Sequence, residues 1–272
     1  MVIFKSAGNR KLNVFSIIVI NYVIAACLGF CIEGSPVISI LNASWLSMAI
    51  IIGILFIVMF FVIALSTIKA GISATSVATK MSVIIPIIFS IIYFRENISF
   101  LKGAGIILAV IAVFLSIYKK EKKSVKDSKS IYLPFVLFLG AGLIDSLIKY
   151  TQQTHISAQD PMIFTSVLFS VSALTGIIIS LIRWKTIPQK DVVITGGYGI
   201  VLGIVNFGSL YGLIRALESG VFDSSIIFGI NNMGIVLLSV IVAVLFFSEK
   251  LTLINKAGII LSIIAIILLS LV

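Results

Sequence analysis

The chain has 272 residues, of which 60% are hydrophobic and 11% charged, and its formal net charge is +10. A water-soluble protein of this size cannot bury so much apolar surface, so lipid must surround most of the chain. The basic residues lie in short segments between apolar runs, which indicates membrane orientation rather than a nucleic-acid partner. The composition therefore predicts an all-α, multi-pass membrane protein.

Nine apolar runs follow one another, and most have close to the ~20 residues that a spanning helix needs. Short polar segments connect them, and the longest polar break is the Lys-rich stretch 119–130. The runs cover residues 14–31, 45–67, 72–94, 103–118, 131–150, 161–182, 195–216, 222–247 and 251–272.

The distribution of basic residues predicts the orientation of these runs. With nine crossings, 15 of the 20 Lys and Arg residues lie on the N-terminal side, four lie on the other side, and Lys80 lies within a run. Because cytoplasmic loops are rich in Lys and Arg, we expect the N-terminus and the linker in the cytoplasm and the C-terminus outside.

The most informative feature is a duplication. Residues 96–108 reappear without a gap as residues 249–261, with six of the 13 positions identical and four more similar. Each copy begins with Glu96 or Glu249 at the end of one apolar run and carries Gly105 or Gly258 in the next. The chain crosses five times between the copies, and an odd number puts them on opposite sides. We interpret this as an inverted-topology repeat, an arrangement of many secondary transporters.

The duplication divides the chain unequally. We expect a first repeat over residues 1–118, a basic cytoplasmic linker over 119–130 and a second repeat over 131–272. Four runs precede the linker and five follow it, which leaves the run 131–150 without a counterpart. Residues 1–5 resemble the end of that run, so we interpret them as the tail of an absent first helix, through a misassigned start or a natural 4+5 arrangement. The alternative is a basic surface tail over residues 1–13.

A half that ends in Glu, followed by a short loop and a Gly-containing apolar helix, and present twice, resembles the EamA-like transporters of the drug/metabolite transporter superfamily. The most specific parts are residues 78–86, which lead to Glu96, and residues 245–249, which lead to Gly258. The resemblance implies ten helices, where this chain has nine runs. It also implies alternating access and the carriage, usually outward, of small metabolites that are often amino acids.

Lys80 is the sharpest candidate for a substrate-binding residue. It lies nine residues into its run, and a cation near the bilayer centre costs about 2.5–3.5 kcal/mol on insertion scales. We expect it to face the bundle interior and bind a substrate carboxylate; the alternative is a snorkelling or ion-paired structural residue. Pro86 cannot donate to the Ser82 carbonyl, so it should kink the helix beside Lys80 and leave an acceptor there.

In the second repeat, Asn231 and Asn232 lie between Gly229 and Gly234. We expect the two amides to line the cavity opposite Lys80, with the glycines permitting a local break or close packing. The alternative is hydrogen bonding between helices, which is worth only about 0.6 kcal/mol on average.

Three further polar residues within runs are candidates for the cavity. Asp145 could partner Lys80 or a travelling proton, or it could pair with Lys149 one turn later on its own helix. Asn206 and Tyr211 are weaker candidates in the run 195–216. For Glu96 and Glu249, helix-end capping is the simpler role, and proton coupling is the alternative.

Together these features predict a secondary active transporter of a small, amino-acid-like or organic-acid metabolite in the bacterial plasma (inner) membrane. Its partners would be the lipid bilayer, the small-molecule substrate and a coupling proton or ion, with the protein a monomer or a homodimer. The sequence carries no catalytic or metal motif, so we expect neither an enzyme nor a cofactor. The alternatives are a multidrug or lipid exporter of the same fold and a non-transporting scaffold or sensor.

Overall fold

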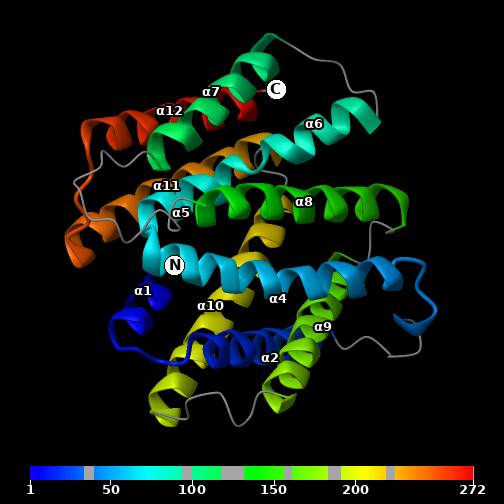
Figure 1. Ribbon diagram of the computed structural model, residues 1–272. Coiled ribbons are helices and arrows are strands. Elements are labelled where there is room, and N and C mark those ends of the chain that lie inside the picture. Colours follow the sequence, from blue (N-terminus) through cyan, green and yellow to red (C-terminus); the bar gives the residue numbers. More distant parts are fainter. Residues whose placement is uncertain are drawn as a thin grey trace. The chain divides into compact units, whose positions relative to one another are not determined.

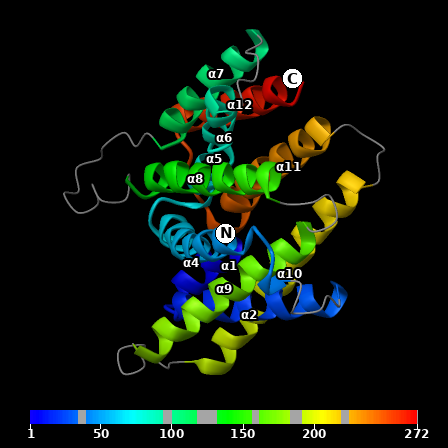
Figure 2. The same cartoon turned by 90° about the vertical axis from the view of Figure 1, so that its right-hand side faces the viewer.

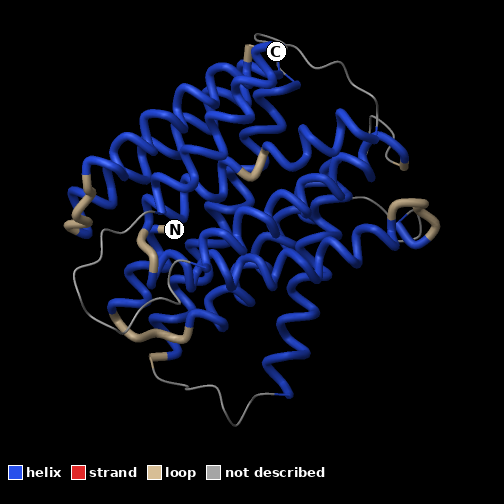
Figure 3. The backbone as a smooth tube through the Cα atoms, turned by 45° about the horizontal axis from the view of Figure 1, so that its top comes forward, coloured by secondary structure: helices blue, strands red, loops and turns tan. Residues whose placement is uncertain are grey.

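The computed structural model describes residues 1–33, 40–93, 100–117, 132–155, 161–182, 191–218 and 224–271. Every regular element within these segments is an α-helix (Figures 1 and 3). The helices are α1 (Val2–Asn9), α2 (Val14–Glu33), α4 (Leu46–Lys69), α5 (Ile72–Met81), α6 (Ile84–Tyr93), α7 (Phe100–Ile117), α8 (Tyr132–Thr154), α9 (Pro161–Ile182), α10 (Val192–Glu218), α11 (Ser224–Phe247) and α12 (Leu253–Ser270).

Each predicted apolar run contains a described helix, with ends that agree within a few residues. Six described segments are long and apolar enough to cross a membrane, judged by length and composition, which identifies an all-α, multi-pass integral membrane protein. They are Val14–Ile32, Leu46–Lys69, Ile72–Tyr93, Tyr132–Thr151, Met162–Ile182 and Val192–Leu213. Nine crossings remain a prediction, and the predicted linker 119–130 lies outside the described residues.

Large apolar side chains are exposed along most of the helices. Ile182 in α9, Phe246 in α11 and Ile107 in α7 are 78%, 76% and 63% exposed. A water-soluble protein rarely exposes contiguous apolar surface on this scale, whereas lipid-facing helices require it.

The helices form two compact units that do not coincide with the halves of the sequence. The first unit comprises Met1–Lys5, Val62–Leu143 and Leu213–Val272, and the second comprises Ser6–Phe61 and Ile144–Gly212. Each unit therefore combines segments from before and after the predicted linker. The repeat boundaries that the sequence predicts remain a prediction.

In the first unit, α7 and α12 pack along each other in opposite directions (Figure 2). Near the start of α7, a Cβ on Gly105 would lie 2.8 Å from the Leu269 side chain at the end of α12. Near the start of α12, the Asn255 amide donates to the Leu115 carbonyl at the end of α7, at 3.2 Å. These two helices carry the two copies of the duplicated segment, so the copies begin at opposite ends of an antiparallel pair.

A core of buried apolar residues joins α5, α6, α7, α11 and α12 within this unit. The core residues are Val77, Met81, Ile84, Ala109, Ala112, Val236, Ile259, Ala265 and Ile266. The core therefore brings together α5 and α11, each of which precedes one copy of the duplicated segment in the sequence.

The second unit is held together by small residues and aromatic rings. Its α2 and α9 pack along each other, and α10 approaches α2 at two glycines. A Cβ on Gly199 would lie 2.6 Å from Ile20, and one on Gly203 would lie 2.8 Å from the Asn21 carbonyl oxygen. Small residues at such contacts let helix backbones approach closely, which is how helices associate in lipid.

Candidate functional site

The segment with Lys80 is two helices rather than one. Helix α5 ends at Met81 and α6 begins at Ile84 (Figure 1). Ser82 and Val83 therefore interrupt the apolar segment Ile72–Tyr93 near its middle. Pro86 stands in the first turn of α6, where a proline is tolerated because its missing N–H would have no helical partner. An interruption at this depth is expected in membrane proteins only where protein or a cavity surrounds it.

The backbone groups freed by the interruption find local partners. The Ser82 carbonyl accepts the Ile85 N–H at 2.9 Å, so it is not the open acceptor that the sequence led us to expect. The Thr79 hydroxyl donates to the Thr75 carbonyl at 2.7 Å, and the Ser82 hydroxyl donates to the Thr79 carbonyl at 2.6 Å. Hydroxyls that bond back onto a helix in this way help to bend it.

Lys80, Asn231 and Asn232 lie on two helices that pack against each other. Lys80 is half-buried in the last turn of α5, and both amides are half-buried in α11. Gly229 lies within α11, which continues through it unbroken, and a Cβ on Gly234 would meet open space. Of the local break and the close packing that the sequence allowed, the break is absent from α11, and Gly234 has no close neighbour among the described residues.

Gly142 brings α8 against the interruption. A Cβ on Gly142 would collide with the Ile85 side chain at the start of α6. Only a residue without a side chain lets the α8 backbone come this close. The start of α6, directly after the interruption, is thus covered by α8 on this side.

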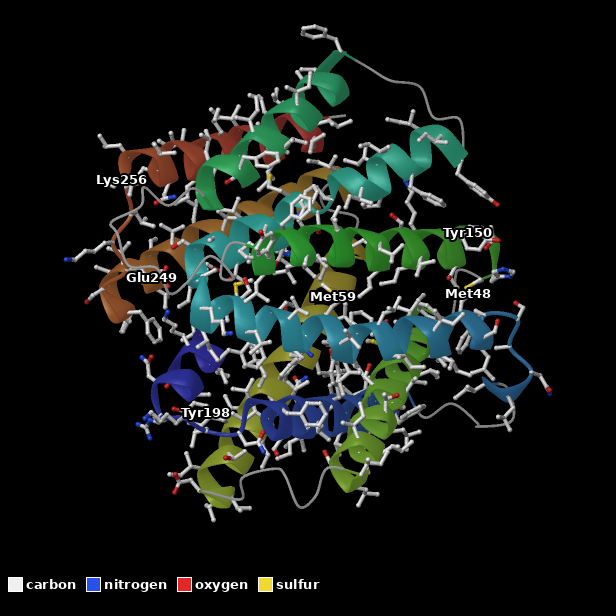
Figure 4. All side chains as sticks on the ribbon, in the orientation of Figure 1. Met48, Met59, Tyr150, Tyr198, Glu249 and Lys256 are labelled. Carbon is white, nitrogen blue, oxygen red and sulfur yellow. The ribbon has the colours of Figure 1, made fainter. Side chains whose placement is uncertain are left out.

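Glu249 binds the N-terminus of α5 (Figure 4). Its carboxylate accepts the Ile72 N–H at 2.7 Å, the Ser73 N–H at 3.4 Å and the Ser73 hydroxyl at 3.2 Å. Lys5 Nζ lies 3.7 Å from Oε1 of the same carboxylate. We call Lys5, Ile72, Ser73 and Glu249 the α5 cap. A carboxylate is favoured here because the first N–H groups of a helix lack helical partners and the helix dipole is positive at this end.

The backbone on both sides of the α5 cap is adapted to the carboxylate. Gly71, just before α5, has φ 107°, and a Cβ there would lie 3.0 Å from both Glu249 oxygens. On the other side, Ser248 has φ 50°, an uncommon conformation for a residue with a side chain. The Glu249 N–H bonds back to the Ala243 carbonyl at 3.0 Å. Both turns therefore hold Glu249 close to α5.

The helix that follows Glu249 has a cap of its own. Thr252 and Asn255 form a capping box at the start of α12, with Asn255 N–H donating to the Thr252 hydroxyl at 3.2 Å. Glu249 therefore caps α5, a helix 177 residues away in sequence, rather than the helix that begins directly after it. Gly258 is buried in α12. Glu96, the equivalent residue of the first copy, lies outside the described residues.

The other candidates belong to the second unit. There the Asn206 amide donates to the Asn21 side-chain oxygen at 3.2 Å, and Asn21 is fully buried. Tyr211 is half-buried and stacks on Phe207, with ring centroids 6.0 Å apart. Asp145 lies on the exposed side of α8. The structure thus gives Asn206 a packing partner that joins α10 to α2.

Sequence reasoning missed several of these partners, and some of them left a signal. Asn21 is an amide in the middle of an apolar run, which the sequence shows plainly. Lys5 and Ser73 gave no comparable signal, because their importance depends on a contact with a carboxylate far along the chain. Among the described residues, no group of three or more His, Cys, Asp or Glu side chains is placed to hold a metal ion.

Comparison with known proteins finds a relative in Haemophilus influenzae. No family model matches the chain. A protein of Haemophilus influenzae whose curated description is "Uncharacterized protein" is 29% identical over 198 residues. The match covers 72% of this chain and 66% of that protein, slightly less than two thirds of its length. The similarity identifies a related chain, and its description assigns no function that could be compared with this one.

Proposed function

We propose that the chain is a secondary active transporter of a small metabolite, amino-acid-like or an organic acid, that works by alternating access in the bacterial plasma (inner) membrane. The observation that carries the proposal is the interruption of an apolar membrane segment at Ser82 and Val83, beside the half-buried Lys80. Transporters build midplane binding sites from such discontinuous helices. A continuous apolar bundle with a merely structural role has no need of this arrangement.

The antiparallel contact of α7 and α12 gives independent support. An inverted repeat relates its two copies by an axis in the membrane plane, so equivalent helices that meet must run in opposite directions. The duplicated segments have this relation within the first unit. It is also the arrangement expected for an EamA-like transporter, and we propose that the chain belongs with them.

In this proposal Lys80 binds the negative end of the substrate. The amides of Asn231 and Asn232 bind its polar remainder from α11, which packs against α5. A cation held away from water pairs strongly with an anionic ligand, because solvent no longer screens the charges. The proposed cargo is therefore an anion or zwitterion rather than a lipophilic cation.

The test has two stages, because the substrate must first be found. Metabolite profiling of cells with and without the protein should give small carboxylates that differ between cells and medium. The purified protein in proteoliposomes should then exchange one of these carboxylates in counterflow. Lys80→Met, which keeps the length of the side chain without its charge, should lower this exchange by about 100-fold, the effect of losing about 2.7 kcal/mol of binding.

The matched control is Lys256→Met, which removes an exposed Lys of α12 and should leave exchange unchanged. Exchange by Lys80→Met at the wild-type rate, with equal amounts of inserted protein, would refute the role of Lys80. An unchanged metabolite profile would argue against metabolite transport altogether. Efflux of lipophilic cations or lipids in the same vesicles would favour the multidrug or lipid exporter instead.

A further inference from the structure

The α5 cap has the composition of a carboxylate-binding site. Two backbone N–H groups, one hydroxyl and one ammonium group converge on the two oxygens of Glu249. The bond from the Ile72 N–H is short at 2.7 Å, as expected of a charge-assisted hydrogen bond, and the other three contacts are longer, at 3.2–3.7 Å. Together these donors are suited to a carboxylate. Nothing in these donors distinguishes the carboxylate of Glu249 from that of a free small molecule.

The Glu249 side chain, which occupies the α5 cap in this structure, is attached to a part of the chain that lets it leave. Glu249 lies in the connection between α11 and α12, so its side chain can withdraw without breaking a helical hydrogen bond. The preceding Ser248 has a left-handed backbone, which costs free energy in the position that the structure shows.

A second observation points to a ligand at the same place. Ser76 is fully buried, and its hydroxyl has no hydrogen-bond partner in the part of the chain that the structure describes. It lies one turn after Ser73 on the same face of α5, and Lys80 follows on that face one turn later. Side chains on a helix lean toward its N-terminus, so the Ser76 hydroxyl is directed toward the α5 cap.

A buried hydroxyl without a partner is costly, and native proteins rarely leave one unsatisfied. The neighbouring hydroxyls of Ser66 and Thr75 show the usual outcome, because they bond to each other at 2.7 Å. The Ser76 hydroxyl is thus a free polar position one turn below a carboxylate site.

We propose that the N-terminal end of α5 is a binding site for a small carboxylate that carries a hydroxyl or amine close to its carboxyl group. The carboxylate of the ligand replaces that of Glu249 on Ile72, Ser73 and Lys5, and its second polar group bonds to Ser76. Glu249 is then a competitor built into the chain, and ligand binding releases the connection between α11 and α12 from α5. The inference rests on the proposed function, for which this would be the entry site of the substrate.

The first experiment replaces the competitor. In full-length Glu249→Ala reconstituted in nanodiscs, acetate should restore thermal stability saturably, because the lost carboxylate leaves a space of its own size. Acetamide and sodium chloride at equal concentrations should not restore it. Glu249→Gln is the matched control, since its amide fills the space and should prevent the rescue. An Ala variant that acetate fails to stabilise would overturn the proposal.

The second experiment tests Ser76 and uses glycolate, which adds one hydroxyl to acetate. Glycolate should bind Glu249→Ala about five- to tenfold more tightly than acetate, as expected for one added hydrogen bond. Adding Ser76→Ala should abolish this preference and leave acetate binding unchanged. Equal affinity of the two anions before that substitution would contradict the role of Ser76.

Two further measures separate failure of the proposed site from misfolding of a variant and from failure of the proposed function. If Glu249→Ala does not fold, Glu249→Asp serves instead, because its shorter side chain cannot reach all the donors and glycolate should stabilise it more than the wild type. Because the readout is stability, it is independent of transport. Transport that persists without any glycolate effect would reject the site alone, whereas glycolate binding in a protein that transports nothing would reject the proposed function alone.

Discussion

Two regions of the first unit, which the sequence predicts to be equivalent parts of an internal repeat, differ in one physical respect. The segment from α5 to α6 is interrupted at Ser82 and Val83, whereas α11 runs unbroken from Ser224 to Phe247. With the 153-residue offset of the duplication, Pro86 corresponds to Ser239. A serine keeps the backbone N–H that a proline lacks, so the second copy can close the hydrogen bond that the first cannot.

The same offset pairs Thr79 with Asn232 and Lys80 with Met233. The interrupted copy therefore holds the cation, and the continuous copy holds the amides. Bending and charge occur together because a Lys within a membrane segment needs polar surroundings, which a regular helix facing lipid cannot supply. The α11 segment thus contributes a continuous helix with two amides, and the α5–α6 segment contributes a broken helix with a cation.

The largest expected effect comes from making the continuous copy like the interrupted one. Ser239→Pro removes the N–H that bonds to the Ile235 carbonyl four residues earlier, and it should lower the free energy of unfolding by about 3 kcal/mol. Circular dichroism during unfolding in mixed micelles measures this loss. Ser239→Ala, which keeps the N–H, should stay within about 0.5 kcal/mol of the wild type. Equal stability of the two variants would show that proline does not account for the difference between the copies.

A smaller effect is expected at the start of α12, where the second copy has a capping box. Asn255→Ala removes the hydrogen bond to the Thr252 N–H and the one to the Leu115 carbonyl of α7. The expected loss is about 1 kcal/mol, the usual value for a helix cap. Unfolding in mixed micelles measures it, with Thr252→Ser as the control because it retains the hydroxyl.

If Asn255→Ala were as stable as the control, the contact between the two copies at this end would have no energetic importance. The first copy has Lys102 at the equivalent position, so the capping box distinguishes the copies. With equal stability of Asn255→Ala and the control, the antiparallel contact of α7 and α12 would depend on apolar packing alone.

The sequence predicted the helices well because a run of apolar residues as long as a bilayer is thick has few other structures. It also located the interruption, because the effect of Pro86 on the carbonyl four residues earlier is local. It did not predict that the Ser82 carbonyl would accept the Ile85 N–H, since that depends on how the chain closes the turn.

The contacts of Glu249 could not be predicted from the residues near it in the sequence. A carboxylate at the end of a run predicts helix capping, but the helix that it caps is 177 residues away and follows from packing. The same limit applies to Asn21 and Asn206, whose hydrogen bond requires α2 and α10 to meet. Residues whose role is set within one or two turns were predictable, and those whose role is set between helices were not.

The smallest expected change in stability comes from the reverse substitution, Pro86→Ala, which makes the interrupted copy like the continuous one. The new N–H at position 86 can bond to the Ser82 carbonyl, but Ile85 already occupies that acceptor, so the free energy of unfolding should change by less than about 1 kcal/mol. The effect should appear in local structure instead. Hydrogen exchange at residues 84–87 should slow if α5 and α6 join, and Pro86→Gly, which restores the N–H but disfavours helix, should leave it fast. Because joining the helices would move Lys80 relative to α11, substrate exchange should fall in Pro86→Ala and persist in Pro86→Gly. Slowed hydrogen exchange together with undiminished transport would mean that the interruption is not part of the binding site.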